Sequence, residues 1–195
     1  HVIAAGNNVY FGSSVDDSVR CLDAETGNER WIYHTDGPIR IAPSYHDGRI
    51  FFGSDDGMVR CLDAENGLLI WSFRPKPLEK LILNNGKLIP FWPIRTGVLI
   101  RNDTAYFAAS LLPWKESYLC AIDAATGKLS ADKHFVKRID NATFEGALLA
   151  SDEHLVAPQG RVSPLIYNRA NGKLLGGHKG GGGCFVMLTP DAGIL

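Results

Sequence analysis

The chain has 195 residues, a formal net charge of −1 and a hydrophobic share of 45%. This balance excludes a disordered chain and a strongly basic nucleic-acid-binding protein, and it gives no attraction to an anionic membrane surface. Glycine is frequent, with 21 residues, as is typical of proteins rich in tight hairpins. No run of residues has the length and hydrophobicity of a membrane-spanning helix.

Two stretches of the chain are near copies of each other, 40 residues apart. They read RCLDAETGNERW over 20–31 and RCLDAENGLLIW over 60–71, and weaker copies follow at 119–130 and 165–174. A repeat of about 40–50 residues built from short strands is typical of a β-propeller. We therefore predict an all-β fold, a β-propeller of four-stranded antiparallel blades with almost no helix.

The second copy shows how one blade is built. Its apolar runs are separated by Asp-Gly and Asn-Gly sequences, which favour tight hairpins because both residues tolerate a positive φ. The strands that we predict are Ile39–Tyr45, Arg49–Gly53, Met58–Leu62 and Leu68–Phe73.

One continuous repeat array favours a single partial propeller over 1–195 rather than two domains. A basic and apolar insertion, 74–92, separates the second and third units, and we expect at most a helical turn in it, at Glu79–Leu83. The chain holds about four blades with a partial unit at each end, which indicates a piece of a larger ring. The predicted blades are 1–35, 38–74, 93–135 and 143–177, with the start of another at 180–195.

The copies resemble the PQQ-type propeller repeat, in which a small residue, an aspartate, Thr-Gly-Lys and a tryptophan recur at fixed spacing. The third copy reaches Ser130 without a tryptophan, and the fourth keeps only its Gly-Lys pair. The resemblance implies a ring of seven or eight blades. The matching positions are Cys21, Asp23, Thr26, Gly27, Trp31, Cys61, Asp63, Gly67, Trp71, Asp123, Thr126, Gly127, Lys128, Gly172 and Lys173.

We expect structural roles for the residues of the repeat. The glycine permits the left-handed residue of a tight turn, and the aspartate accepts hydrogen bonds from turn amides. The resemblance implies that the tryptophan packs between neighbouring blades. These structural residues are Asp23, Gly27, Trp31, Asp63, Gly67, Trp71, Asp123 and Gly127.

The resemblance covers two function classes, quinoprotein dehydrogenases and the lipoprotein scaffold of the outer-membrane barrel-assembly machinery. We predict a non-catalytic binding or scaffolding propeller, bacterial and periplasmic or otherwise extracytoplasmic, without a catalytic residue, metal or cofactor. The alternatives are a fragment of a PQQ-dependent dehydrogenase, which would need PQQ and calcium, and the sensor ectodomain of a larger receptor. The dehydrogenases carry a disulfide between adjacent cysteines, whereas the cysteines here are scattered, at Cys21, Cys61, Cys120 and Cys184.

Three charged residues form the candidate ligand site. Arg40, Arg95 and Glu145 each stand ten residues before an aligned position of a second strand, and these positions are Ile50, Ala105 and Leu155. We expect them around one mouth of the central channel, where two guanidiniums can clamp a carboxylate or phosphate. A purely structural charge ring is the alternative.

A protein partner or a small anionic ligand is expected at this funnel mouth or at the blade edges, and nucleic acid is not. The insertion 74–92 is the second candidate contact, either a binding loop or a lid. The glycine run 180–183 precedes an apolar strand rather than a helix, which favours a flexible loop over a phosphate cradle. The rest of the ring is expected from further chain or from another copy.

Overall fold

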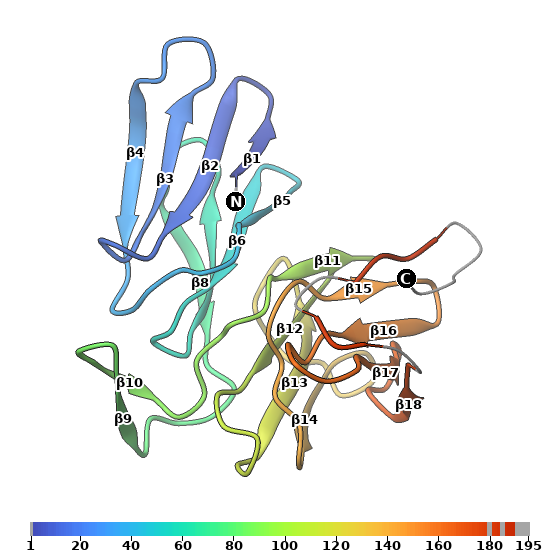
Figure 1. Ribbon diagram of the computed structural model, residues 1–195. Coiled ribbons are helices and arrows are strands. Elements are labelled where there is room, and N and C mark those ends of the chain that lie inside the picture. Colours follow the sequence, from blue (N-terminus) through green and yellow to red (C-terminus); the bar gives the residue numbers. More distant parts are fainter. Residues whose placement is uncertain (1, 179–180, 184–185, 190–195) are drawn as a thin grey trace.

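The computed structural model describes residues 2–178, 181–183 and 186–189. The described residues form antiparallel sheets and no helix (Figure 1). Four of the sheets have four strands, and in each of them every strand pairs with the next one along the chain. The predicted all-β propeller of four-stranded blades is thereby confirmed.

Each four-stranded sheet is one blade, and the first strands of the first three blades lie next to one another. We call the side where these first strands gather the hub. The strands are β1 (Val2–Ala5), β2 (Asn8–Ser13), β3 (Ser18–Asp23) and β4 (Glu29–His34) in the first blade; β5 (Ser44–His46), β6 (Arg49–Gly53), β7 (Val59–Asp63) and β8 (Leu69–Phe73) in the second; β11 (Leu99–Arg101), β12 (Thr104–Ala109), β13 (Ser117–Asp123) and β14 (Phe135–Ile139) in the third; and β15 (Leu149–Ala150), β16 (His154–Ala157), β17 (Leu165–Asn168) and β18 (Leu174–Gly177) in the fourth.

The first strand of the second blade is shorter than predicted. The sequence indicated a strand over Ile39–Tyr45, but β5 begins only at Ser44. Proline at position 43 has no N–H to donate to a ladder, and Ile39 leaves the sheet plane to pack on Gly12 of the first blade. The segment 39–43 therefore crosses to the neighbouring blade instead of extending β5.

The insertion is a β-hairpin, so the helical turn predicted at Glu79–Leu83 is wrong. Strand β9 (Leu81–Asn84) pairs with β10 (Lys87–Pro90), and the turn residues Asn85 and Gly86 have φ values of 48° and 79°. An Asn-Gly pair with two positive φ values suits a two-residue hairpin turn. Buried Ile89 anchors this hairpin to the blades.

The aspartate of each repeat organises the turn that follows it. Oδ1 of Asp23 accepts hydrogen bonds from the backbone N–H of Thr26 at 2.8 Å and from its hydroxyl at 3.0 Å. Arg30 and these Thr26 donors hold the pKa of Asp23 well below its usual range. Asp63 and Asp123 accept the equivalent backbone bonds, at 3.1 and 2.7 Å.

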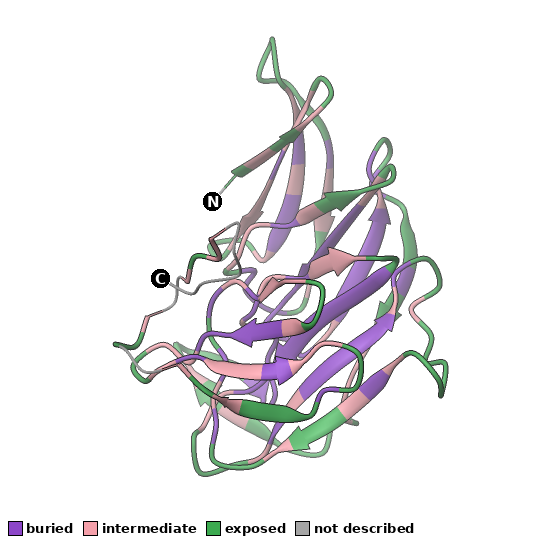
Figure 2. Cartoon of the chain, turned by 90° about the vertical axis from the view of Figure 1, so that its right-hand side faces the viewer, coloured by how far each residue is buried: buried purple, intermediate pink, exposed green. Residues whose placement is uncertain are grey.

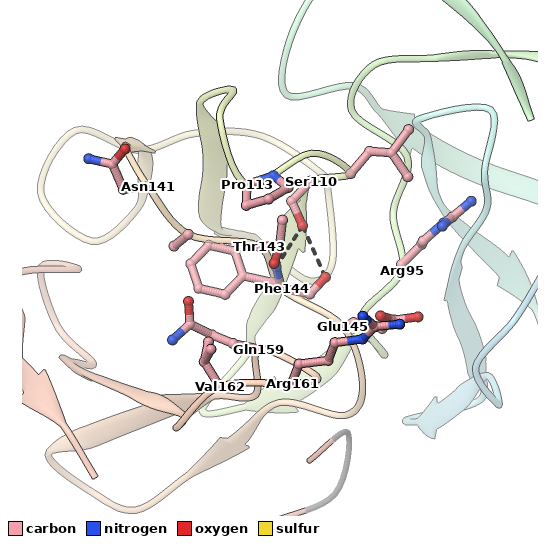
Figure 3. A pocket seen from close by; sticks show the side chains of 12 residues that line it. Arg95, Ser110, Pro113, Asn141, Thr143, Phe144, Glu145, Gln159, Arg161 and Val162 are labelled. Atoms are coloured by element: carbon pink, nitrogen blue, oxygen red, sulfur yellow. Dashed lines mark hydrogen bonds between the residues drawn. The ribbon is translucent and has the colours of Figure 1, made fainter. Parts of the chain in front are cut away.

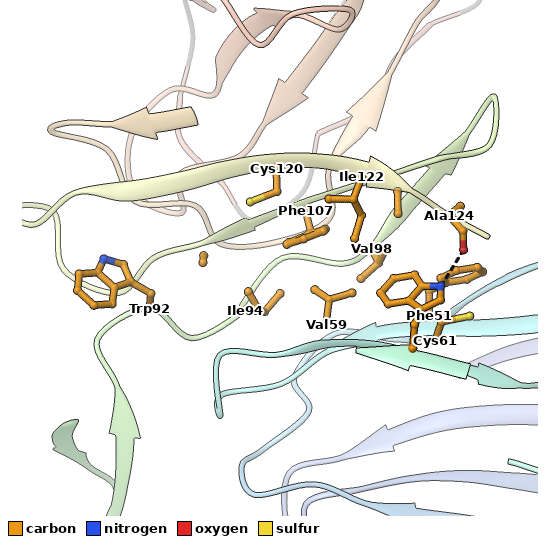
Figure 4. Packing of buried hydrophobic residues seen from close by; sticks show 13 residues of the cluster. Phe51, Val59, Cys61, Trp92, Ile94, Val98, Phe107, Cys120, Ile122 and Ala124 are labelled. Atoms are coloured by element: carbon orange, nitrogen blue, oxygen red, sulfur yellow. Dashed lines mark hydrogen bonds between the residues drawn. The ribbon is translucent and has the colours of Figure 1, made fainter. Parts of the chain in front are cut away.

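Tryptophans dock each of the first two blades onto the next. The Trp71 ring lies against Gly127 so closely that a Cβ there would come within 2.6 Å of the ring. Its indole Nε1–H donates to the carbonyl of Ala124 at 3.0 Å, the bond drawn in Figure 4. Trp31 repeats this arrangement on Gly67 and the Ala64 carbonyl.

Phe135 takes the place of tryptophan in the third blade. It lies opposite Ala121 in the ladder, as Trp71 lies opposite Cys61, and a Cβ on Gly172 would come within 2.7 Å of its ring. The third copy has four more residues between Asp123 and Phe135 than the second copy has between Asp63 and Trp71. The spacing of the repeat therefore predicted the docking residue four positions too early.

The hydrophobic core is divided into clusters between adjacent blades, so buried residues follow the strands throughout the sheets in Figure 2. The cluster between the second and third blades is the one drawn in Figure 4. Cys21, Cys61 and Cys120 are buried free thiols within these clusters. Of the predicted start of another blade at 180–195, residues 180, 184–185 and 190–195 lie outside the described residues, and of the glycine run 180–183 only the first residue does.

Candidate functional site

The segments that carry Arg40, Arg95 and Glu145 meet at the hub. The backbone N–H of Gly146 donates to the Arg95 carbonyl at 3.2 Å, and Thr96 forms a parallel bridge with Gly146. Arg40 and Arg95 converge on a single carboxylate. The predicted residues are therefore neighbours: Arg40 and Arg95 share that carboxylate, and Arg95 and Glu145 line the same pocket.

That carboxylate belongs to Asp55, whose side chain is 1% exposed. Arg40 donates to its Oδ2 from Nε at 2.8 Å and from Nη2 at 2.7 Å. Arg95 donates from Nε to Oδ1 at 3.1 Å and from Nη2 to Oδ2 at 2.9 Å. Asp55 raises the pKa of Arg40, and the three groups together keep one positive charge. The two guanidiniums thus already clamp an anion that the protein itself supplies.

Sequence reasoning missed Asp55 because it assigned the whole Asp-Asp-Gly stretch to a hairpin turn. Only the second aspartate serves the turn: Asp56 accepts from the backbone N–H of Met58 at 2.9 Å and pairs with Arg60 at 2.7 Å. One turn needs one such acid, so the extra aspartate was the signal that could have indicated Asp55.

The third blade has a serine in the place of Asp55. Counted from the aligned positions Ile50 and Ala105, five residues later, Asp55 corresponds to Ser110. The Ser110 hydroxyl accepts from the backbone N–H of Phe144 at 2.7 Å and donates to its carbonyl at 3.0 Å. This position offers no carboxylate to a neighbouring arginine, so the clamp is not repeated.

A pocket of about 500 Å³ lies beside Ser110, between the third and fourth blades (Figure 3). Its walls include the apolar side chains of Leu111 and Val162, and two exposed charged residues, Glu145 and Arg161, line it as well. Within the described part of the chain, neither Glu145 nor Arg161 forms an ion pair. The pocket therefore combines apolar walls with two charges available to a ligand.

The insertion hairpin lies close to the charge cluster formed by Arg40, Asp55 and Arg95. The hairpin residues Asn84 and Lys87 line a smaller pocket of about 200 Å³ together with Arg40 and Asp55. Lys87 also forms an ion pair with Asp17 of the first blade. The hairpin thus lies beside the hub, and a position beside the hub is compatible with the binding loop or lid predicted for the insertion.

No group of His, Cys, Asp and Glu side chains that could hold a metal ion occurs among the described residues. Cys21, Cys61 and Cys120 lie in different strands, and burial raises the pKa of each thiol, that of Cys61 to about 12. The described segments also contain no helix that is long and apolar enough to cross a bilayer.

Comparison with known proteins gives a family and a fold. The family model described as outer membrane protein assembly factor BamB matches residues 1–142. No curated protein matches the chain in sequence.

Three solved structures illustrate the fold. Quinohemoprotein alcohol dehydrogenase ADHIIG from Pseudomonas putida HK5 is similar with a TM-score of 0.70 and 14% identity, over 99% of this chain and 37% of that one. The quinohemoprotein alcohol dehydrogenase from Comamonas testosteroni gives 0.71 and 13%, over 93% of this chain and 34% of that one. The computationally designed Ika4 protein gives 0.62 and 15%, over 86% and 88%. The chain thus spans little more than a third of either dehydrogenase.

Proposed function

This chain belongs to the PQQ-type propeller family of outer membrane protein assembly factor BamB, and from that premise we propose that it is a non-catalytic binding propeller. The pocket between the third and fourth blades is its binding site. One observation carries the proposal: Glu145 and Arg161 line this pocket without an ion-pair partner among the described residues, whereas Arg40 and Arg95 are already paired with Asp55.

The ligand is a carboxylate attached to an apolar group, as in an acidic peptide segment of a partner protein. Arg161 offers a guanidinium that can hold the carboxylate with paired hydrogen bonds. Leu111 and Val162 offer apolar surface for the adjoining side chain, and Glu145 selects a ligand that also donates, such as a peptide N–H or an amine. We place this binding outside the cytoplasm of a bacterium, in keeping with the family's description as an outer membrane assembly factor.

The test uses the peptide acetyl-Leu-Phe-Asp as a probe and ¹⁵N-labelled protein observed by NMR. Amide shifts should cluster at Phe144, Gln159 and Arg161. Arg161→Gln should weaken binding at least tenfold, about 1.4 kcal/mol. The matched control is Arg101→Gln, since Arg101 is an arginine outside this pocket that pairs with Asp152.

Three results would contradict the proposal. The first is the absence of shifts at the pocket at millimolar peptide, and the second is equal weakening by the Arg161 and Arg101 substitutions. The third is quinone absorbance together with alcohol oxidation after the protein is mixed with PQQ and calcium, since this would identify a dehydrogenase instead.

A further inference from the structure

The loop between the second and third strands of a blade is longer in the two blades that border the pocket than in the first two. In blade order these loops are 14–17, 54–58, 110–116 and 158–164. The two longer loops supply Pro113 and Val162, which lie on opposite sides of the pocket in Figure 3. Among the described blades, these loops are therefore longest at the proposed binding site.

Trp114, on the loop 110–116, differs from the other three tryptophans of the chain. Trp31, Trp71 and Trp92 are 8–9% exposed, and each donates its indole N–H to a backbone carbonyl. Trp114 is 72% exposed, and within the described part of the chain its ring has no aromatic neighbour and its indole N–H has no acceptor. A ring this exposed contributes little to the stability of its own blade.

The loop that carries Trp114 is anchored at both ends. At one end, the Ser110 hydroxyl accepts from the Phe144 backbone N–H and donates to its carbonyl. At the other end, the Trp92 indole N–H donates to the Glu116 carbonyl at 2.8 Å. The protein therefore holds an exposed ring on a fixed loop, which lowers the entropy that a ligand contact to this ring would cost.

A tight turn places Trp114 at the rim of the pocket. The backbone N–H of Lys115 donates to the Leu112 carbonyl at 3.0 Å and closes a β-turn with Pro113 at its second position, where proline is favoured. Pro113 lines the pocket, and Trp114 is the next residue. Rotation about χ1 is therefore enough to bring the unpacked ring over the pocket mouth.

We propose that Trp114 is a second anchor of the peptide site, an inference that rests on the proposed function. Arg161 belongs to the loop across the pocket from Pro113, so a peptide whose carboxylate is held by Arg161 leaves the pocket toward Trp114. The indole ring packs on the apolar side chain that precedes the one held by Leu111 and Val162. The partner segment thus carries two apolar residues ahead of its carboxylate.

Paired peptides and variants test this inference. The probes are acetyl-Leu-Phe-Asp and acetyl-Gly-Phe-Asp, which differ only in the side chain assigned to Trp114. Trp114→Ala should weaken binding of the leucine peptide about fivefold and leave binding of the glycine peptide unchanged. Trp114→Phe should keep most of the affinity for the leucine peptide, because an aromatic ring remains.

Acrylamide quenching of tryptophan fluorescence gives an independent readout. The other three tryptophans are buried, so quenching reports mainly on Trp114. The leucine peptide should protect this ring from acrylamide, and the glycine peptide should not. The matched control is Val15→Ala, since Val15 is 91% exposed on the corresponding loop of the first blade and should not affect either peptide.

Two outcomes would overturn this inference and leave the proposed function intact, provided that Arg161→Gln still weakens binding. They are equal weakening of both peptides by Trp114→Ala, and a leucine peptide that binds Trp114→Ala as tightly as the unsubstituted chain without protecting the ring. If the leucine peptide does not bind, or if Arg161→Gln has no effect on it, the proposed function and this inference both fail.

Discussion

The interface between the second and third blades and the one between the third and fourth are built on the same plan but differ at both ends. Away from the hub, the second–third interface has a tryptophan whose indole N–H is bonded to the next blade, whereas the third–fourth interface has Phe135, which has no such donor. At the hub, the second–third interface holds Asp55 between two arginines, whereas the third–fourth interface holds Ser110 beside an open pocket.

The difference shows how one repeat gives both a closed interface and an open pocket, the pocket that we propose binds a ligand. At the third–fourth interface both positions differ: Ser110 stands where Asp55 does and Glu145 where Arg95 does, so no aspartate–arginine clamp forms there. The pocket then stays open, and its charges remain available. We infer that binding in this propeller lies where the repeat departs from its own pattern, because the positions that keep the pattern already satisfy one another.

The largest effect should come from removing the ring between the second and third blades. Trp71→Ala should lower the free energy of unfolding by about 3–5 kcal/mol, because it leaves a cavity and an unpaired Ala124 carbonyl. Urea unfolding followed by circular dichroism measures this. Trp114→Ala is the control, since Trp114 is 72% exposed and its loss should change little. A loss below 1 kcal/mol at Trp71 would remove the basis for the docking interface.

A smaller loss should follow from opening the closed charge cluster. Asp55→Ala leaves two adjacent guanidiniums without their anion and should cost about 2–4 kcal/mol, less than a fully buried pair because Arg40 is partly exposed. The control is Asp152→Ala, which breaks an exposed ion pair with Arg101 and should cost less than about 1 kcal/mol. Equal stability of the two variants in urea would show that Asp55 is not needed to hold the arginines.

The smallest effect concerns pH and the thiols of the same interface. Burial raises the pKa of Cys61 to about 12 and also raises that of Cys120, so the folded chain keeps these protons at a pH where the unfolded chain loses them. Stability should therefore be unaffected near neutral pH and fall as the pH rises above about 9.

Iodoacetamide labelling at pH 8, read by peptide mass mapping, checks the burial behind that prediction. Both thiols should react far more slowly in the folded chain than in urea. The third–fourth interface has Ala121 at the position of Cys61, and alanine has no thiol for iodoacetamide to label. Rapid labelling of the folded chain would mean that the second–third interface opens readily.

Local chemistry explains why much of the fold could be predicted from the sequence. Asp-Gly and Asn-Gly turns and the short apolar runs between them act within a few residues, so three strands of the second blade were placed to within one residue. The errors lie where short-range signals conflict, at Ile39–Tyr45 with its proline and at Glu79–Leu83, which a neighbouring Asn-Gly turn pairs as a hairpin.

The amino-acid sequence by itself determined the blade, its turns and the two tryptophans that dock one blade on the next, because those residues repeat at a fixed spacing along the chain. Only the tertiary structure decided which groups the charged residues Arg95 and Glu145 contact at the hub. Arg95 reaches Asp55, 40 residues earlier, while Glu145 lines a pocket with Arg161. Such pairings depend on which blades lie side by side and on one side chain at Ser110, and no local pattern records them.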